Sequence, residues 1–491
     1  MNPSPNLKGG RPVVSAMSSF FSLPQCIHPR AAFPDFPRNA TQWFLHTIAM
    51  SLNPYLFRAT IVAALGGLLF GFDTAVIAGA TAALADLFEL TPAMLGVTVS
   101  SALWGTVLGA MFGGWSGDRF GRRDSLRILG LFYLLSALGC ALAWDWYSFL
   151  IARFLGGLAI GASSVLGPMY IAEIAPARLR GRLVGLFQFN IVLGILLAYF
   201  SNYVIGLAGF GASEWRWKLG IEAVPAAIFL ALLFGIPRSP RWLVKRGLID
   251  EARQVLKLTG ETNYEAELQN IIESIDAEHG HADEPLFTRK YRFPVFLAIS
   301  IAMFNQLSGI NAILYYLNDI FAQAGFDKVS SDLQAVALGS ANLLFTILAM
   351  SVIDRLGRKK LLLIGSVGCA LSLAGTAWIF FTGTNKHLLV FMLAGFTASF
   401  AFSQGAVIWV YLSEVFPNRV RAKGQSLGSF THWAMNAIIA AVFPVLAALS
   451  QAGPFVFFCA MMVAQFFVVL SVFPETKGYT LEQMQKRLGI Q

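Results

Sequence analysis

The feature that most limits how this chain can fold is a series of long apolar runs. Each run holds roughly 20 residues or more, enough to cross the hydrocarbon core of a bilayer as an α-helix. A transmembrane strand would need only about 10 residues of alternating polarity. The sequence is 56% apolar and 13% charged, which excludes a water-soluble domain of this size. We therefore predict an all-α membrane protein with twelve transmembrane helices, at about 55–80, 94–116, 126–144, 147–172, 183–207, 216–236, 293–321, 332–353, 360–382, 387–412, 424–449 and 453–473.

Lysine and arginine gather in alternate loops between these runs. One set of loops holds 119–127, 178–182, 237–292, 355–360, 419–423 and the C-terminal tail, whereas the opposite loops hold Arg216, Lys218, Lys328 and Lys386. Basic loops remain on the cytoplasmic side. We therefore expect a multi-pass protein of the cell (plasma or inner) membrane with both termini in the cytoplasm. The net charge of +9 reflects this topology and the lipid headgroups rather than a nucleic-acid partner.

The chain repeats itself about halfway along its length. GGWSGDRFGRRDSL at 113–126 returns as IDRLGRKKL at 353–361, and MYIAEIAPARLRGR at 169–182 returns as VYLSEVFPNRVRAK at 410–423. Such matches at nearly one offset indicate two homologous halves of six helices that face the same way. We predict an N-terminal extension at 1–49, poorly ordered and cytoplasmic, six-helix bundles at 50–236 and 293–473, a cytoplasmic linker with short helices at 237–292, and a cytoplasmic tail at 474–491.

Two short loops with the pattern D-R-x-G-R-R/K join spans two and three and spans eight and nine. Glu173 and Glu414 lie at the cytoplasmic ends of spans four and ten, and a basic cluster follows each of them. A carboxylate beside fixed guanidinium groups forms a latch that must break when this face opens. We prefer this interpretation to basic residues that only set orientation, because loop and acid recur together. The predicted latch comprises Asp118, Arg119, Arg122, Glu173, Arg180, Asp354, Arg355, Arg358, Glu414 and Arg421.

Several ordered motifs carry a resemblance to a known family. They are GDRFGRR at 117–123, PMYIAEIAPARLRG at 168–181, SPRWL at 239–243, QLSGIN at 306–311 and PETKG at 474–478. Over about 51–485 the sequence resembles the sugar porter family of the major facilitator superfamily. One departure is Arg238, because the family usually has Glu before S-P-R-W-L. This departure concerns one cytoplasmic salt bridge and leaves the expected fold unchanged.

Asp73 lies inside the first apolar run, where a charge costs roughly 2.5–3.5 kcal/mol even on insertion scales. Counting residues from the span ends at ~1.5 Å per residue places Asp73, Arg153 and Glu222 at similar depth in one half. An acid held between desolvation and an arginine can bind and release a proton. A fixed structural ion pair is the alternative. The resemblance implies proton coupling, because proton-driven bacterial sugar symporters carry Asp, Arg and Glu at these places and facilitators carry Asn instead of the Asp.

A sugar site needs polar groups that bind hydroxyls, and aromatic rings that cover the apolar face of a pyranose. Isolated amides in spans more often join helices to one another, but here the whole set resembles the sugar contacts of the family. The predicted substrate-binding residues are Phe70, Gln188, Asn305, Gln306, Asn311, Asn342, Trp409, Trp433 and Asn436. His432, beside Trp433, is interpreted either as a helix contact or as a residue that tunes sugar choice. Tyr315 and Tyr316 are candidates for an outer gate, with aromatic packing as an equal alternative, and Gly309 would let this helix bend.

We therefore predict proton-coupled import of a monosaccharide, pentose or hexose, by alternating access. The expected partners are the sugar, the proton and the lipid bilayer, with no cofactor, no metal and a functional monomer. The 4 cysteines show no ligand or disulfide spacing. The alternatives are a facilitative uniporter with the same fold, and a non-transporting sugar sensor. An enzyme is disfavoured, since no catalytic constellation is recognisable.

Overall fold

The computed structural model describes residues 53–176, 179–279, 284–417, 419–479 and 481–490, and the predicted extension 1–49 lies outside them. All the regular structure in these ranges is helical, and twelve stretches are long and apolar enough to cross a membrane. The first half contains α2 (Pro54–Val76), η1 (Ile77–Gly79), α3 (Thr81–Leu87), α4 (Pro92–Phe120), α5 (Arg122–Leu142), α6 (Trp146–Ile174), α7 (Arg180–Ala208), η2 (Gly211–Ser213), α8 (Glu214–Gly220), α9 (Ala223–Leu232) and η3 (Leu233–Gly235).

The second half repeats this arrangement after a helical linker. The linker forms α10 (Pro240–Lys245), α11 (Ile249–Leu258) and α12 (Tyr264–His279), in agreement with the predicted short helices. The second half contains η4 (Arg289–Tyr291), α13 (Arg292–Leu307), α14 (Ile310–Tyr315), α15 (Leu317–Gln323), α16 (Lys328–Leu356), α17 (Arg358–Thr382), η5 (Lys386–Leu388), α18 (Leu389–Phe402), α19 (Gln404–Glu414), α20 (Arg421–Leu449) and α21 (Gly453–Ser471), and the tail forms α22 (Leu481–Arg487).

Three of the spans are broken, and the sequence predicts only the bend in the seventh of them. The seventh span bends at Gly309, which has φ of 84° and separates α13 from α14. A Cβ at this position would come within 2.2 Å of the Phe458 ring, so only glycine satisfies both the backbone and the packing. The tenth span breaks at Ser403 and the sixth at Ile221–Glu222. Apolar composition alone does not reveal such breaks, because it is the same on both sides of them.

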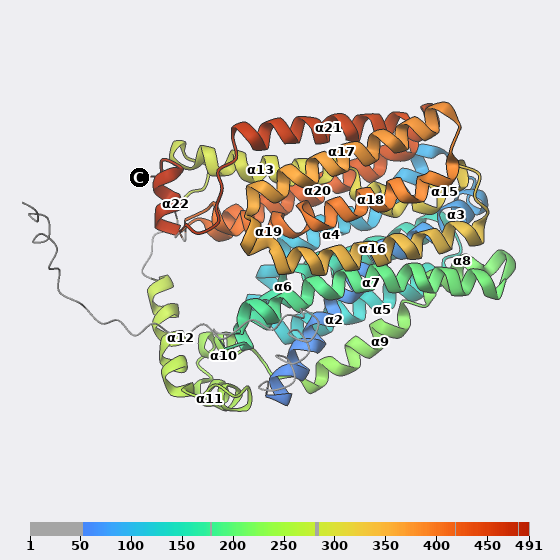
Figure 1. Cartoon of the computed structure of the whole chain (residues 1–491). Coiled ribbons are helices and arrows are strands. Elements are labelled where there is room, and N and C mark those ends of the chain that lie inside the picture. The colour runs from blue at the N-terminus through green and yellow to red at the C-terminus, as the bar shows by residue number, and fades with distance from the viewer. Residues whose placement is uncertain (1–52, 177–178, 280–283, 418, 480, 491) are drawn as a thin grey trace, which may run out of the picture. The chain divides into compact units, whose positions relative to one another are not determined.

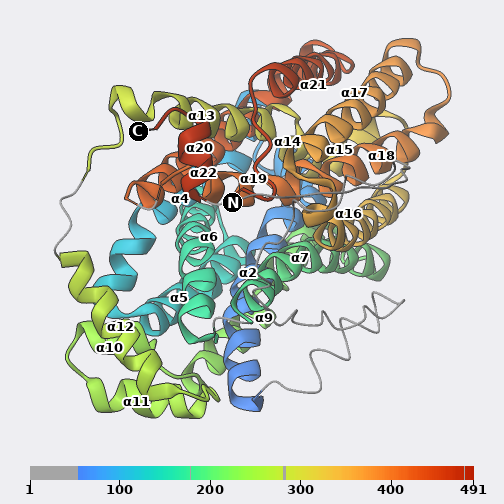
Figure 2. The same cartoon turned by 60° about the vertical axis from the view of Figure 1, so that its left-hand side comes forward.

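The spans run side by side between two ends of the molecule (Figures 1 and 2). We call the end that carries α10, α11, α12 and α22 the linker end, and the end that carries α3, α8 and α15 the far end (Figure 1). The two halves meet where α4 packs against α20 and α7 packs against α16. These two helix pairs flank the centre of the molecule, where the predicted site residues lie.

The buried apolar side chains of the spans form one cluster that includes both halves and two clusters that each lie within one half. One cluster joins both halves and includes Tyr199 of the first half and Leu314 of the second half. The Tyr199 hydroxyl donates to the Leu314 carbonyl at 2.9 Å. Two further clusters each belong to one half, and the one in the second half includes tail residues such as Met484. The far end is therefore held together across the halves.

Glycines bring α4 and α6 into close contact. A Cβ at Gly157 would lie 1.8 Å from the Ala102 carbonyl oxygen, and one at Gly161 would lie 2.1 Å from that of Thr106. In a membrane, helices associate through van der Waals packing of small residues of this kind. The contact fixes the position of α6, which carries Arg153.

Candidate functional site

An acid and an arginine face each other in the core of the first half. Asp73 of α2 is 2% exposed, and Arg153 of α6 is 3% exposed. Arg153 Nη1 donates to Asp73 Oδ1 in a buried ion pair. Asp73 Oδ2 and Arg153 Nε are buried and have no hydrogen-bond partner among the described residues. The carboxylate therefore keeps one oxygen on which a proton can be placed.

Glu222 is buried in the turn between α8 and α9 and interacts electrostatically with both Asp73 and Arg153. The three residues that residue counting placed at similar depth thus lie together. The turn at Ile221–Glu222 interrupts the sixth span at this level and brings the carboxyl group inward. Two acids and one arginine share the site, so the group carries one net negative charge when both acids are ionised, and a single proton neutralises it.

Tyr133 of α5 also lies near these charges and was not predicted. Its hydroxyl is 2.8 Å from the Ser163 hydroxyl, and its ring is 1% exposed. It interacts electrostatically with Asp73 and Glu222. A tyrosine in an apolar span is typical of helix packing, and no sequence signal separates that role from a place beside a charged site.

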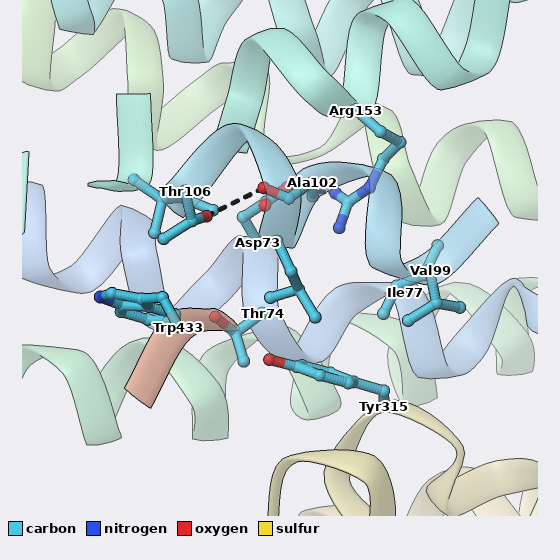
Figure 3. Close-up of a pocket in the computed structure, with 11 residues that line it drawn as sticks. Asp73, Thr74, Ile77, Val99, Ala102, Thr106, Arg153, Tyr315 and Trp433 are labelled. Atoms are coloured by element: carbon cyan, nitrogen blue, oxygen red, sulfur yellow. Dashed lines mark hydrogen bonds and ion pairs between the residues drawn. The ribbon is translucent and has the colours of Figure 1, made fainter. Parts of the chain in front are cut away.

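A small cavity lies beside Asp73 and reaches the second half. Figure 3 shows Asp73 of α2 and Arg153 of α6 pointing toward each other, with Tyr315 and Trp433 of the second half close by. The cavity is also lined by α4 residues, among them Thr106, which donates to the Ala102 carbonyl at 2.9 Å. The space open to the centre of a water molecule is only about 10 Å³, or room for roughly one water. A sugar would need these walls to move apart.

A network of amides occupies the bend of the seventh span. Gln306 Nε2 donates to Asn305 Oδ1 at 3.1 Å, and Asn311 Nδ2 donates to Gln306 Oε1 at 3.0 Å. The same Gln306 nitrogen lies 3.1 Å from Nε2 and 3.2 Å from Nδ1 of His432. His432 is therefore in direct contact with Gln306, one of the residues predicted to bind the sugar. Such amides both donate and accept, as recognition of hydroxyl groups requires.

Aromatic rings connect this network to the buried acid. The Trp433 ring lies 5.4 Å from the Phe70 ring and 5.0 Å from the His432 ring, and Trp409 packs on His432 at 5.2 Å. Phe70 is one helical turn before Asp73 on α2. Trp433, which also lines the cavity beside Asp73, therefore contacts both the polar network and the helix of the acid.

Of the other predicted substrate-binding residues, Asn436 contacts the wall of the cavity, whereas Gln188 and Asn342 lie on α7 and α16. Asn436 Nδ2 donates to the Tyr315 hydroxyl at 3.0 Å, which links it to the cavity wall. Gln188 is half-buried on α7 and Asn342 is buried on α16, two helices that pack against each other. Among the described residues, no hydrogen bond or ring contact joins the side chains of Gln188 and Asn342 to the amide network or to the aromatic rings. Gln404, which was not predicted, is buried, and its backbone carbonyl accepts from Asn305 at 3.4 Å.

The predicted latch residues form ion pairs within each half. Arg122 of α5 lies 2.9 Å from Glu173 of α6 and 2.9 Å from Asp118. Ser239 at the start of the linker donates to the same Glu173 carboxylate. Arg119 contributes its main-chain carbonyl, which accepts from Arg246 of the linker. Glu173 and the Arg119 carbonyl thus both join the first half to the linker.

The second half repeats this arrangement with the tail in place of the linker. Arg358 lies 2.9 Å from Glu414 and 3.0 Å from Asp354. Thr476 of the tail donates to Glu414 at 2.6 Å. The main-chain carbonyl of Arg355 accepts from Lys477. Arg421 donates to the Phe416 carbonyl at 3.4 Å, and Arg180 is exposed at the start of α7, so these two arginines are placed apart from the acid–arginine pairs.

Arg238, the departure from the family pattern, has acidic neighbours on two elements. Its Nε lies 3.5 Å from Asp124 Oδ2, and its Nη1 lies 3.7 Å from Glu251 Oε1. The cation in this position therefore connects α5 with the linker helix α11.

Two like-oriented sets of six spans, with a polar and aromatic site at their junction, define a membrane transporter of the major facilitator type. A profile of the sugar (and other) transporter family matches residues 59–488. The chain belongs to this family of sugar transporters, and it is a multi-pass protein of the plasma membrane.

Characterised relatives are similar over most of the chain. The arabinose-proton symporter of Bacillus subtilis is 38% identical over 440 residues, which cover 88% of this chain and 95% of the relative. The D-xylose-proton symporter of Escherichia coli K12 is 36% identical over 472 residues, covering 88% and 96%.

Solved structures agree with the fold. The inward-open conformation of the xylose transporter XylE from E. coli has a TM-score of 0.79 at 34% identity, covering 88% of this chain and all of that one. XylE bound to 6-bromo-6-deoxy-D-glucose has a TM-score of 0.73, covering 89% and 100%. The predicted fold class, twelve transmembrane helices in two six-helix repeats with a helical linker, is confirmed.

Proposed function

We propose that the protein imports a monosaccharide, a pentose or a hexose, together with a proton by alternating access. The observation that carries this proposal is the buried Asp73–Arg153 pair, which lies on a cavity shared with Trp433 and Tyr315 of the second half. A proton on Asp73 and a sugar at the aromatic network would thus meet at one junction. The arabinose- and xylose-proton symporters among the relatives support the same combination.

In this proposal the proton acts by changing the charge that Arg153 faces. Ionised Asp73 holds Arg153 in a low-dielectric site, where their attraction is strong. Protonation of Asp73 at its unpaired Oδ2 removes that attraction and leaves Glu222 as the remaining acid beside Arg153. The site can then rearrange, and α2 can move relative to Trp433. Release of the proton restores the original pair.

The sugar binds in this proposal between the seventh span and the aromatic rings. Asn305, Gln306, Asn311, Asn436 and His432 bind its hydroxyl groups, and Trp433 covers its apolar face. Phe70, Trp409, Gln188 and Asn342 complete the wall as the two halves move together.

The linker end faces the cytoplasm in this proposal, since the basic loops and the linker are on that side. Both termini then lie in the cytoplasm, the far end faces outward, and one chain is the functional unit. The ion pairs at Glu173 and Glu414 act as latches that tie the linker and the tail to their own halves.

The test is transport in proteoliposomes by wild-type protein and by Asp73→Asn. We expect the variant to lose proton-driven accumulation of D-xylose or L-arabinose and to retain counterflow exchange, because it keeps the shape of the site and cannot cycle its charge. Asp86→Asn, at an exposed position of α3, is the control and should behave as wild type. Accumulation that survives in Asp73→Asn would assign the protein as a uniporter or place the coupling elsewhere.

A further inference from the structure

A cluster of charges is buried at the far end, away from the site described above. Lys218 of α8 is fully buried, and its Nζ lies 2.9 Å from Asp332 Oδ2 of α16 and 2.9 Å from Glu214 Oε1 of α8. Asp332 is 1% exposed. Lys218 belongs to the first half and Asp332 to the second, so this ion pair crosses the interface between the halves.

The cluster is completed by residues of both halves. Asn318 of α15 donates to Asp332 Oδ1, and Lys328 Nζ lies 3.0 Å from Glu214 Oε2. Gly206 of α7 leaves room for the acid, because a Cβ there would come within 2.9 Å of Asp332 Oδ2. Two lysines and two acids balance each other, and both oxygens of Asp332 have partners. The pair thus meets the conditions under which buried charges are tolerated.

From this geometry we infer that the Lys218–Asp332 pair is a lock that holds the far end closed. The two charges are compensated only while α8 and α16 touch, and they become hydrated when the far end opens. Removing one partner leaves an unpaired buried charge in the closed conformation alone, which shifts the equilibrium toward opening. Replacing both by apolar residues of similar volume removes the penalty and restores closure.

The lock is distinct from the latches at the linker end. The Arg122–Glu173 and Arg358–Glu414 pairs each join helices of one half, whereas Lys218–Asp332 and Lys328–Glu214 join the two halves. The inference rests on the movement of the halves in the proposed function, but it needs neither the sugar nor the proton.

The test is a distance measurement across the far end, in a background whose 4 cysteines are replaced by alanine. Spin labels at Ala82→Cys and Thr384→Cys, both exposed, report on the first and second halves. We expect Lys218→Met to lower the closed-to-open ratio about tenfold or more, and Lys218→Met with Asp332→Leu to return it toward that of the parent. Lys386→Met, an exposed far-end lysine, is the matched control and should leave the ratio unchanged.

The lock would be overturned if the spin-label distance distribution of Lys218→Met equalled that of Lys386→Met. It would also be overturned if the double variant showed the same closed-to-open ratio as Lys218→Met. If Lys218→Met fails to fold, Asp332→Asn keeps the side-chain shape and should open the far end in the same direction. Accumulation assays on the same proteins separate the two proposals. If the wild type shows no proton-driven accumulation but Lys218→Met still changes the spin-label distances, only the proton mechanism is rejected. If accumulation is normal but the distances do not change in Lys218→Met, only the lock is rejected.

Discussion

Asp319 shows how one side chain can make a conformational equilibrium depend on pH. It lies on α15 at the far end beside Thr81 of the first half, and its Oδ2 is buried without a hydrogen-bond partner among the described residues. Burial raises the pKa of Asp319 to about 7, and a hydrogen bond with Thr81 lowers it in part. Tyr316 is the titratable group that interacts with it from the adjoining turn. Burial at this position therefore favours the protonated form of the acid relative to a hydrated carboxyl group.

The sign of the pH effect follows from this raised pKa. If opening hydrates Asp319 and returns its pKa toward its ordinary value of 3.8, closing takes up a proton between these two values. The closed conformation then gains stability as the pH falls below about 7, by at most about tenfold per pH unit. Above about pH 7 the carboxylate is ionised in both conformations, and the ratio becomes constant.

We expect the closed fraction, measured with the far-end spin labels in an Asp73→Asn background, to rise between pH 8 and pH 6. Asp319→Asn should make this response flat, because an amide does not titrate in this range. The Asp73 substitution removes the contribution of the acid at the central site. An equal pH response with and without the Asp319 carboxyl would show that another group is responsible.

The sequence identified the charged residues of the central site but not all their neighbours. Asp73, Arg153 and Glu222 were found because charges are costly in an apolar span, and the helical rise gave their depth. Tyr133 was missed because its only polar side-chain atom is a hydroxyl, and its aromatic ring is as compatible with a lipid-facing position as with the protein core. Lys218 was interpreted only as a loop charge, because its acidic partner, Asp332, is distant in the sequence.

At the scale of elements, glycine determines how closely α4 and α6 approach. Gly157 is a sharp test, because a methyl group there would overlap the Ala102 carbonyl oxygen at 1.8 Å. We expect Gly157→Ala to destabilise the folded protein by about 1–3 kcal/mol through overpacking. Thermal unfolding of purified protein in detergent measures the loss.

Gly114 on α4 is the matched control, since a Cβ there would meet nothing within 4 Å. Gly114→Ala should unfold at or slightly above the wild-type temperature, because alanine is the better helix former. If both variants unfolded at the same temperature, the close approach of α4 to α6 would not limit stability.

The helix breaks also belong to this scale. The bend at Gly309 was expected from the sequence, but the breaks at Ser403 and Ile221–Glu222 were not. A glycine has an evident conformational reason to end a helix, whereas Ser403 and Glu222 are compatible with a helix. The local sequence pattern therefore gives no reason to expect these two breaks.

At the scale of the whole molecule, the linker and the tail play equivalent roles in the two halves. The Tyr170 hydroxyl donates to the Pro237 carbonyl at 2.8 Å, and Tyr411 donates to the Pro474 carbonyl at 3.4 Å. Each attachment centres on one glutamate at the linker end, Glu173 or Glu414. The internal repeat therefore extends beyond the spans to the segments that follow each half.

We expect Glu173→Ala to lower the free energy of unfolding by about 3 kcal/mol or more. It leaves the buried Arg122 guanidinium with Asp118, which is largely exposed, and it also removes the acceptor of Ser239. Loss of one partner of a buried ion pair has a cost of this order. Chemical denaturation of the purified protein measures it.

Asp118→Ala is the control, because an exposed member of an ion pair contributes at most about 1 kcal/mol. Equal effects of the two substitutions would mean that Glu173 does not hold the linker end together.

The sequence by itself determined the number of spans, the internal repeat, the family motifs and the presence of an acid and an arginine at equal depth. These properties depend on composition, periodicity and helical rise, which are local or count along the chain. Only the tertiary structure decided that Glu222 and Tyr133 join that pair, that Trp433 connects the acid to the amide network, and that Lys218 meets Asp332. These contacts lie between helices distant in sequence, where packing, not any local pattern, selects the neighbours.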